Sequence, residues 1–268
     1  MDQRLAQKAS DNLKAVRAQK PLIHNITNYV VMNYTANALL ACGASPVMAH
    51  APEEVEEMVS FAGALVLNIG TLTLDWVESM VKAGREANRR GVPIVLDPVG
   101  SGATRLRTDS AKRLIDELRI QVIRGNASEV LSLARHGSRT KGVDSIHGVD
   151  EAADAARQLA GELGTTLAIT GAVDLVTDGE RVLRVYNGHE LMGKVTGTGC
   201  TATVVIGAFL AVDRDSVEAT ATALAYFGLA GEVAASAAKM PGSFQIALLD
   251  ALYTIDEAKL AAGAKIKA

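Results

Sequence analysis

The stretch "ALVLNIGTLTLDWVESMVKAGREANRRGVPIVLDPVG", residues 64–100, indicates how the chain folds. Its two ends, 64–70 and 93–100, are short apolar runs without polar alternation, which is typical of parallel strands covered on both faces. Between them, residues 73–90 carry one apolar face at helical spacing, and Gly91 follows as a helix-terminating residue. The stretch therefore predicts a strand, a helix and a second strand parallel to the first.

The same alternation extends along the first 170 residues of the chain. It predicts further strands at 21–27, 45–49, 121–126 and 166–170, and further helices at 30–42, 52–62, 108–118 and 149–163. Pro52 is expected in the first turn of its helix, and Gly43 just past the end of another. This order favours an α/β fold with a mostly parallel central sheet between two layers of helices.

After residue 170 the pattern changes. A hairpin is predicted to turn at Asp178-Gly179, Ala-rich helices to fill 199–238, and a last helix to start near Ser243. Residues 136–148 have the composition of a surface loop. Because no Pro/Ser-rich linker or internal repeat divides the chain, we interpret residues 1–268 as a single domain.

Composition excludes several classes of protein. With 49% hydrophobic and 21% charged residues and a net charge of −3, the chain is expected to be compact and soluble, without a basic face for nucleic acid. We find no signal peptide and no apolar run of the ~18 residues that span a bilayer, so a cytoplasmic protein without membrane contact is predicted. The two cysteines, Cys42 and Cys200, lack metal-ligand spacing, so neither a disulfide framework nor a zinc site is indicated.

Most of the predicted strands end in polar residues or glycines. In an open parallel sheet, ligands bind beyond the carboxyl ends of the strands. Any one of these residues alone is an ordinary turn or helix-capping residue, but their recurrence predicts a shared crevice. The strand ends are 24–28, 68–70, 97–100, 124–126 and 170–171.

Asp97 and Glu129 are the candidate metal ligands. Asp97 follows an apolar strand and precedes Pro98, which does not suit a routine helix cap, and Mg²⁺ is commonly held by one or two carboxylates together with substrate phosphates. Glu129 lies three residues after Asn126, so a capping box explains this pair equally well. Arg124 is either a solvated charge or a planar donor fork for a nucleotide phosphate.

The segment "GKVTGTGCTATVVIGAFLA", residues 193–211, joins a glycine-rich turn to an apolar helix. Its free backbone N–H groups and helix dipole predict an anion site. Gly197, Gly199 and Ala202 also match a loose dinucleotide fingerprint, but that fingerprint belongs in the first strand-helix-strand unit of its fold. Cys200 is either a small buried residue or a reactive thiol, and its place in the first helical turn predicts a pKa below the usual ~8.5.

These motifs resemble those of ribokinase-like kinases. "VTGTGC" (195–200) resembles their glycine-rich anion hole, "NASE" (126–129) their N-x-x-E motif, and "DPVGSGA" (97–103) their vitamin-kinase branch. With these and further matching segments, nearly the whole chain resembles the hydroxyethylthiazole kinase family. The further segments are 24–49, 67–72, 168–171 and 241–245.

The resemblance implies an activity and an assembly. The family has the ribokinase-like three-layer α/β/α fold and phosphorylates the primary alcohol of hydroxyethylthiazole with Mg-ATP, in thiamine salvage. It forms homotrimers with active sites between subunits. Most ribokinase-like enzymes have aspartate at the end of the glycine motif, whereas this branch has cysteine, so the resemblance implies that Cys200 is the catalytic base.

The resemblance also implies roles for the other candidate residues. Mg²⁺ would be organised by Glu129 with Asp97, directly or through water. Two groups of residues would contact the substrates. The ATP-binding residues implied are Arg124, Thr170, Gly197, Thr198 and Gly199, and those implied for the thiazole pocket are Met48, Asn25 and Gly197.

Two other functions fit the predicted fold and crevice. A lyase that repairs hydrated nicotinamide cofactors would act on hydrated NADH, whereas a kinase would consume ATP with a thiazole alcohol. A noncatalytic sensor would bind the thiazole without turning over ATP, and Asp97 and Glu129 would then be dispensable.

Overall fold

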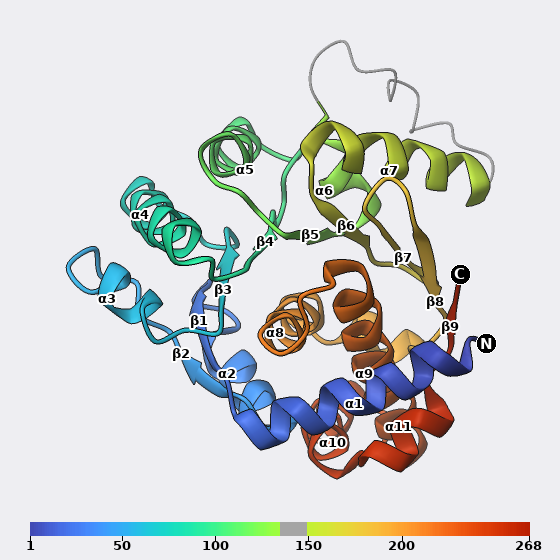
Figure 1. Ribbon diagram of the computed structural model, residues 1–268. Coiled ribbons are helices and arrows are strands. Elements are labelled where there is room, and N and C mark those ends of the chain that lie inside the picture. The colour runs from blue at the N-terminus through green and yellow to red at the C-terminus, as the bar shows by residue number, and fades with distance from the viewer. Residues whose placement is uncertain (135–148) are drawn as a thin grey trace.

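The computed structural model describes residues 1–134 and 149–268, and within these ranges a single nine-stranded sheet runs through the protein. Its strand order is β2-β1-β3-β4-β5-β6-β7-β8-β9 (Figure 1). Strands β1 to β6 are all parallel to one another, whereas the pairs β6–β7, β7–β8 and β8–β9 are antiparallel. The strands are β1 (Leu22–Ile26), β2 (Ser45–Val47), β3 (Ala64–Asn68), β4 (Ile94–Asp97), β5 (Val122–Gly125), β6 (Thr166–Ile169), β7 (Asp174–Thr177), β8 (Val182–Val185) and β9 (Ile266–Lys267).

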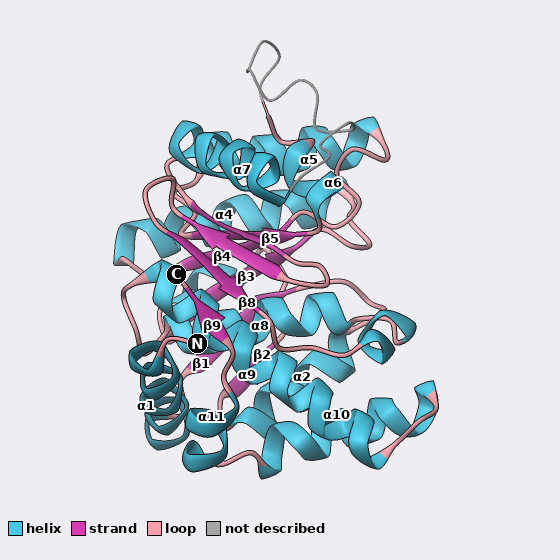
Figure 2. Ribbon diagram, turned by 90° about the vertical axis from the view of Figure 1, so that its right-hand side faces the viewer, coloured by secondary structure: helices cyan, strands magenta, loops and turns pink. Residues whose placement is uncertain are grey.

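Helices cover both faces of the sheet, as Figure 2 shows. One side carries α3 (Val55–Val59), α4 (Leu74–Arg90), α5 (Arg105–Glu117), α6 (Ala127–Leu131) and α7 (Val149–Leu163). The other side carries α8 (Thr198–Leu210) and α9 (Ser216–Ala237), with α1 (Gln3–Gln19), α2 (Met32–Cys42), α10 (Pro241–Thr254) and α11 (Glu257–Gly263) around them. This arrangement confirms the predicted three-layer α/β/α fold with a mostly parallel sheet.

The sheet separates two apolar cores, and β3 shows why its sequence lacks polar alternation. Ala64 and Val66 pack into the core beneath α8 and α9, whereas Leu65 and Leu67 pack into the core beneath α4 and α5. All four residues are fully buried. Because successive side chains of a strand point to opposite faces, a strand between two helical layers needs apolar residues at every position.

Most predicted elements are present with shorter ends. Gly43 and Gly91 end α2 and α4 in the left-handed conformation, at φ +101° and +71°, as expected. The prediction that Pro52 lies in the first turn of its helix is wrong, because α3 begins only at Val55. Helix α5 begins three residues before the predicted start, since the Thr104 side chain caps it by accepting a hydrogen bond from the Arg107 backbone N–H.

Several elements were not assigned from the sequence, among them α1, α11 and β9. Helix α1 is capped by Asp2, whose carboxylate accepts hydrogen bonds from two backbone N–H groups of the first turn. The predicted surface loop at 136–148 lies outside the described residues. Among the helices that are described, none is both long and apolar enough to cross a membrane.

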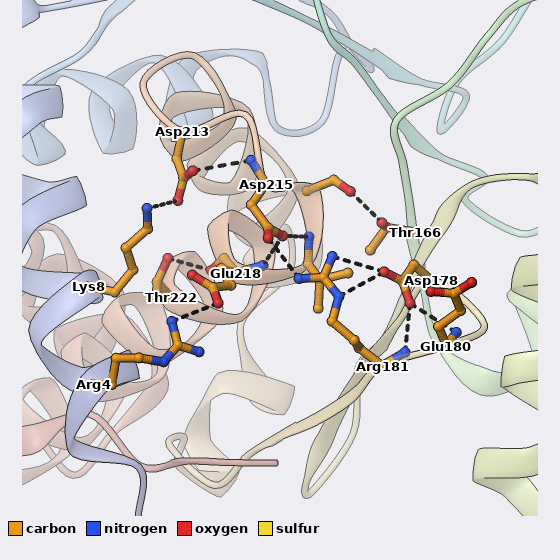
Figure 3. Close-up of polar contacts among 12 residues, drawn as sticks. Arg4, Lys8, Thr166, Asp178, Glu180, Arg181, Asp213, Asp215, Glu218 and Thr222 are labelled. Atoms are coloured by element: carbon orange, nitrogen blue, oxygen red, sulfur yellow. Dashed lines mark hydrogen bonds and ion pairs between the residues drawn. The ribbon is translucent and has the colours of Figure 1, made fainter.

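Ion pairs join α1, α9 and the β7–β8 hairpin (Figure 3). Arg181 of the hairpin contacts Asp178 at 2.9 Å and Asp215, the N-cap of α9, at 2.7 Å. Nearby, the Thr166 and Ser216 hydroxyls lie 2.6 Å apart. Since these residues begin β6 and α9, the network lies at the amino ends of the parallel strands, away from their carboxyl ends.

Candidate functional site

The amino end of α8 lies over the carboxyl ends of β3, β4 and β5. The Thr203 hydroxyl of α8 donates a 2.8 Å hydrogen bond to Asp97 Oδ2, which fastens the helix to the end of β4. At Gly199, a Cβ atom would lie only 2.5 Å from Arg124 Nη1, so the helix backbone and the β5 guanidinium are in direct contact. The structure thus brings together the strand ends and the glycine-rich turn that the sequence singled out.

A cavity of about 560 Å³ opens beside this contact. Four of the residues implied for ATP line it, namely Arg124, Thr170, Thr198 and Gly199. Asp174, the first residue of β7, also lines the cavity, and burial raises the pKa of its carboxyl group to about 6. The volume of the cavity is within the usual range for small-molecule sites.

Arg124 carries unused hydrogen-bonding capacity in this cavity. Its Nη2 donates a 2.5 Å hydrogen bond to Thr170 Oγ1, and its Nη1 lies 3.8 Å from Asp97 Oδ2. The side chain is only 12% exposed. Its Nε is buried, yet it has no hydrogen-bond partner among the described residues. A buried, unpaired guanidinium donor is costly, and its planar fork suits a phosphate.

Asp97 has one oxygen occupied and one oxygen unpaired. The residue is 1% exposed, and its Oδ2 accepts hydrogen bonds from Asn68 Nδ2 at 2.9 Å and from Thr203. Its Oδ1 is buried and accepts no hydrogen bond in the described part of the chain. Burial raises the pKa of the carboxyl group, although Arg124 and Thr203 oppose this shift. An unpaired oxygen on a buried carboxyl group fits a hard cation.

Glu129 forms the capping box that the sequence left open as an alternative. Its Oε2 accepts a 2.9 Å hydrogen bond from the Asn126 backbone N–H, and Asn126 Oδ1 accepts one from the Glu129 N–H. Its Oε1 accepts a 2.8 Å hydrogen bond from the Gly100 N–H, three residues after Asp97. Glu129 therefore caps α6 and also ties that helix to the loop that follows β4.

Cys200 is the third residue of α8, and two side-chain amides donate to its sulfur. The distances to Sγ are 3.2 Å from Asn68 Nδ2 and 3.6 Å from Asn28 Nδ2. Burial, with the nearby Asp97 carboxylate, raises the pKa of the thiol to about 12. The predicted lowering of this pKa is wrong, because desolvation and a neighbouring negative charge outweigh the partial charge of the helix terminus.

Asn28 and Asn68 lie at strand ends that the sequence analysis noted, but they were assigned no role. Both are nearly fully buried, at 4% and 2% exposure. Each is an ordinary turn residue in its local sequence. Only the packing of α8 on the sheet shows that they face Cys200.

The glycine-rich turn begins at a position that requires glycine. Gly197 is the N-cap of α8 at φ +86°, and a Cβ there would lie 2.7 Å from Val31 Cγ1. The Thr198 hydroxyl donates to the Met192 carbonyl oxygen at 2.8 Å, so this side chain fastens the turn. What the turn offers a ligand is its backbone N–H groups, which lack helical partners in the first turn.

Two of the three residues implied for the thiazole pocket, Asn25 and Met48, do not line the cavity. Asn25, on β1, is fully buried and donates a 3.3 Å hydrogen bond to the Thr35 hydroxyl, while its Oδ1 has no partner among the described residues. Met48 follows β2 and is half-buried. Neither is among the described residues that line the 560 Å³ cavity.

Comparison with known proteins identifies the family. The model of the hydroxyethylthiazole kinase family matches residues 13–258. The chain is 64% identical over 259 residues to a hydroxyethylthiazole kinase from Desulfotalea psychrophila, covering 97% of this chain and 95% of that protein. A solved structure of a hydroxyethylthiazole kinase protein from Pyrococcus horikoshii OT3 is 50% identical, with a TM-score of 0.90 over 97% of this chain and 98% of that one.

A more distant structure supports the fold alone. A ribokinase-like superfamily protein from Enterococcus faecalis V583 is 12% identical, with a TM-score of 0.66 over 96% of both chains. The extent and identity of the closer matches go beyond a shared fold. The chain belongs to the hydroxyethylthiazole kinase family.

Proposed function

We propose that the protein transfers the γ-phosphoryl group of ATP to the hydroxyethyl group of 4-methyl-5-(2-hydroxyethyl)thiazole, giving the thiazole phosphate for thiamine salvage. The observation that carries the proposal is that Arg124 and Asp97, neighbours beside the amino end of α8, each keep one buried polar atom without a partner among the described residues. Such a site suits an anion that arrives with a cation. Family membership favours this reaction over cofactor repair and over ligand sensing.

Arg124 and the α8 turn would hold the phosphates of ATP. Thr170 accepts a 2.5 Å hydrogen bond from Nη2, and Nε has no partner among the described residues, so the guanidinium keeps donor capacity for a phosphate. The backbone N–H groups of Gly197, Thr198 and Gly199 would surround the transferring group. Because phosphoryl transfer depends mainly on positioning and on electrostatic stabilisation, these groups would supply most of the catalysis.

Mg²⁺ fits the carboxylates of the site. Asp97 offers the unpaired Oδ1, while both oxygens of Glu129 already accept backbone hydrogen bonds and would organise the ion through water. In the described part of the chain no group of three or more His, Cys, Asp or Glu side chains could hold a metal. This suits an ion that completes its coordination with substrate phosphates and water. When bound, Mg²⁺ supplies positive charge that balances the phosphates.

Cys200 would face the alcohol and accept its proton. Only the thiolate can do so, and a pKa of about 12 keeps that form scarce at neutral pH. A loose transition state tolerates such a weak contribution, because the alcohol proton leaves late.

Met48 and Asn25, with Gly197, would line the thiazole pocket at a boundary between subunits. The resemblance to the family, which implies a thiazole pocket between subunits, is what supports this assignment. We therefore propose a homotrimer, in the cytoplasm, with its active sites between subunits.

A coupled ADP-release assay over a panel of thiazole and pyrimidine alcohols tests the function. We expect Mg²⁺-dependent ADP release with hydroxyethylthiazole and much less with the other alcohols, and product mass that shows one added phosphate. ATP turnover with hydrated NADH in place of the alcohol would favour the repair lyase. Thiazole binding by calorimetry without any ADP release would favour the sensor.

A further inference from the structure

Asn68 uses every hydrogen-bonding position of its side chain. Its Oδ1 accepts hydrogen bonds from Asn28 Nδ2 at 2.8 Å and from the Gly70 N–H at 3.0 Å. Its Nδ2 donates to Asp97 Oδ2 at 2.9 Å and to Cys200 Sγ at 3.2 Å. A buried amide with two donors and two acceptor sites satisfied has one stable orientation. Turned by 180°, it would set an oxygen against the Asp97 carboxylate and a donor against Asn28.

The position of Asn68 follows from the sheet. Asn68 and Asp97 are partners in the parallel register of β3 and β4, so their side chains leave the sheet side by side. Cys200 reaches the pair from α8, which Thr203 fastens to the same Asp97 oxygen. One amide therefore bridges the candidate metal ligand and the candidate base.

Asn28 contacts the Asn68 amide through its own side chain. Its Oδ1 accepts a 3.1 Å hydrogen bond from the Val30 N–H, which leaves its Nδ2 for Asn68 Oδ1 and Cys200 Sγ. A Cβ at Gly70 would lie 2.5 Å from Asn28 Nδ2, so the glycine leaves the space that the Asn28 side chain occupies. These contacts make the two asparagines and the sulfur a single packed unit.

We propose that Asn68 is a positioning residue that fixes the Cys200 sulfur relative to Asp97, with Asn28 holding the orientation of the Asn68 amide. The inference rests on the proposed kinase function. Its physical reason is that a cysteine side chain on a helix can occupy more than one staggered rotamer about its Cα–Cβ bond. Two amide donors aimed at the sulfur select one rotamer, and the same donors stabilise negative charge that forms on the sulfur.

A double-mutant cycle tests whether Asn68 acts through Cys200. The four proteins are wild type, Asn68→Leu, Cys200→Ala and the double variant, and the quantities are kcat and the KM for the alcohol and for ATP. We expect Asn68→Leu to lower kcat by about 10- to 100-fold in the wild type, with both KM values within about threefold, and to lower it by much less when Cys200 is already absent. An equal loss in both backgrounds would overturn the proposal.

Asn12 provides the matched control. It is buried to a similar degree, at 5% exposure, and its Nδ2 donates to Asp213 at 3.0 Å and to the Thr222 hydroxyl at 3.1 Å, beside the ion-pair network of Figure 3. Asn12→Leu removes a buried amide without touching the site. We expect it to lower the melting temperature and to leave kcat unchanged. A fall in kcat to match Asn68→Leu would show that the loss is general to the fold.

A crystal structure of Asn68→Leu tests the same proposal without any assay of activity. We expect the Cys200 side chain to occupy more than one rotamer in this variant and one rotamer in Asn12→Leu. A single, unmoved Cys200 rotamer would overturn the positioning role, whether or not the protein phosphorylates the thiazole. If Asn68→Leu fails to fold, Asn28→Ala is the milder variant, with the same expected change at Cys200. Failure of the kinase function would instead appear as a wild-type protein without ADP release.

Discussion

At the scale of single residues, the pKa of Cys200 is unfavourable for the base role that we propose for it. Burial and the Asp97 carboxylate raise this pKa to about 12, so the sulfur is a protonated thiol at pH 7. A carboxylate at the same position would be ionised in a larger fraction at pH 7, because its reference pKa of ~3.9 lies far below the ~8.5 of a thiol. The surrounding donors, Asn68 and Asn28, suit an anionic oxygen as well as sulfur.

We therefore expect Cys200→Asp to retain or exceed the wild-type kcat, and Cys200→Leu to lose about 10²-fold, the low end of general-base effects. The measurement is kcat for hydroxyethylthiazole phosphorylation, with melting curves for the three proteins. Wild-type activity should also rise from pH 7 to pH 9 as the thiolate fraction grows, since this range lies below the thiol pKa of about 12. A folded Cys200→Asp as inactive as Cys200→Leu would exclude the base role.

Asp174 predicts a pH dependence of stability. Burial raises its pKa from 3.8 to about 6, so the folded state holds this proton more tightly than the unfolded state. Ionisation of Asp174 therefore lowers the free energy of unfolding. This loss is absent below pH 3.8, grows as the pH rises to about 6 and is constant above it, at most about 3 kcal/mol. Asp174→Asn keeps an acceptor for the 3.0 Å hydrogen bond from the Gly171 N–H.

We expect Asp174→Asn to be more stable than wild type at pH 7 by about 1–3 kcal/mol, and nearly equal to it at pH 4. Urea unfolding at several pH values between 4 and 8 measures the difference. Asp109→Asn, at a mostly exposed carboxylate of α5, is the control and should change little. A constant difference across this pH range would show that ionisation of Asp174 is not its cause.

At the scale of elements, Gly199 at the amino end of α8 leaves room for the Arg124 guanidinium and is a poor helix former. Gly199 lies within α8, where alanine is the better helix former by up to about 1 kcal/mol. An alanine Cβ would lie 2.5 Å from Arg124 Nη1, however, so the guanidinium would have to move. Stability and ATP binding should therefore change in opposite directions.

For Gly199→Ala we expect an unchanged or higher melting temperature and a KM for ATP raised about tenfold, equivalent to one charge-assisted hydrogen bond of about 1.4 kcal/mol. Gly161→Ala is the control, because this glycine lies in α7 with no atom within 4 Å of its added Cβ. It should leave the KM for ATP unchanged. An unaltered KM in Gly199→Ala would mean that Arg124 does not contact the nucleotide.

At the scale of the whole molecule, two neighbouring helices carry exposed apolar side chains. Helices α2 and α10 pack against each other, and the Tyr34 hydroxyl of α2 donates to the Gln245 carbonyl oxygen of α10 (Figures 1 and 2). Leu40 of α2 is 58% exposed, and Ile246 and Tyr253 of α10 are 66% and 72% exposed. Large exposed apolar side chains on adjoining elements are typical of subunit interfaces.

If this surface joins the copies of the proposed homotrimer, Ile246→Glu should dissociate it. Light scattering should then give the mass of three chains for wild type and of one chain for the variant, with the monomer losing activity if the thiazole pocket lies between subunits. Leu106→Glu, at a residue of α5 that is 48% exposed, controls for the added charge and should remain a trimer. A monomeric wild-type protein would refute the proposed assembly.

The sequence by itself determined the layered fold and most of the strand ends that meet at the site. Strands buried on both faces need apolar residues at every position, and helices between them need one apolar face, so runs such as 64–70 and 73–90 identify their elements locally. The glycine-rich turn at 195–200 is likewise a local pattern. Strand β9 was missed because it has two residues and pairs with a distant part of the chain, at β8. Helix α1 was missed although its Asp2 cap and the apolar spacing of Leu5, Ala9, Leu13 and Val16 are local signals.

Only the tertiary structure decided the chemistry around Cys200. The hydrogen bonds that join Cys200 to Asn68 and Asn28 connect residues 132 and 172 positions apart. The pKa of the thiol depends on burial beneath such distant groups and on Asp97, so its position in a helix predicted the wrong direction of shift. The capping box of Asn126 and Glu129 could be predicted from the four residues 126–129. The hydrogen bond from the Gly100 N–H to Glu129 could not. Local spacing specifies elements, whereas solvation and long-range contacts specify what their side chains can do.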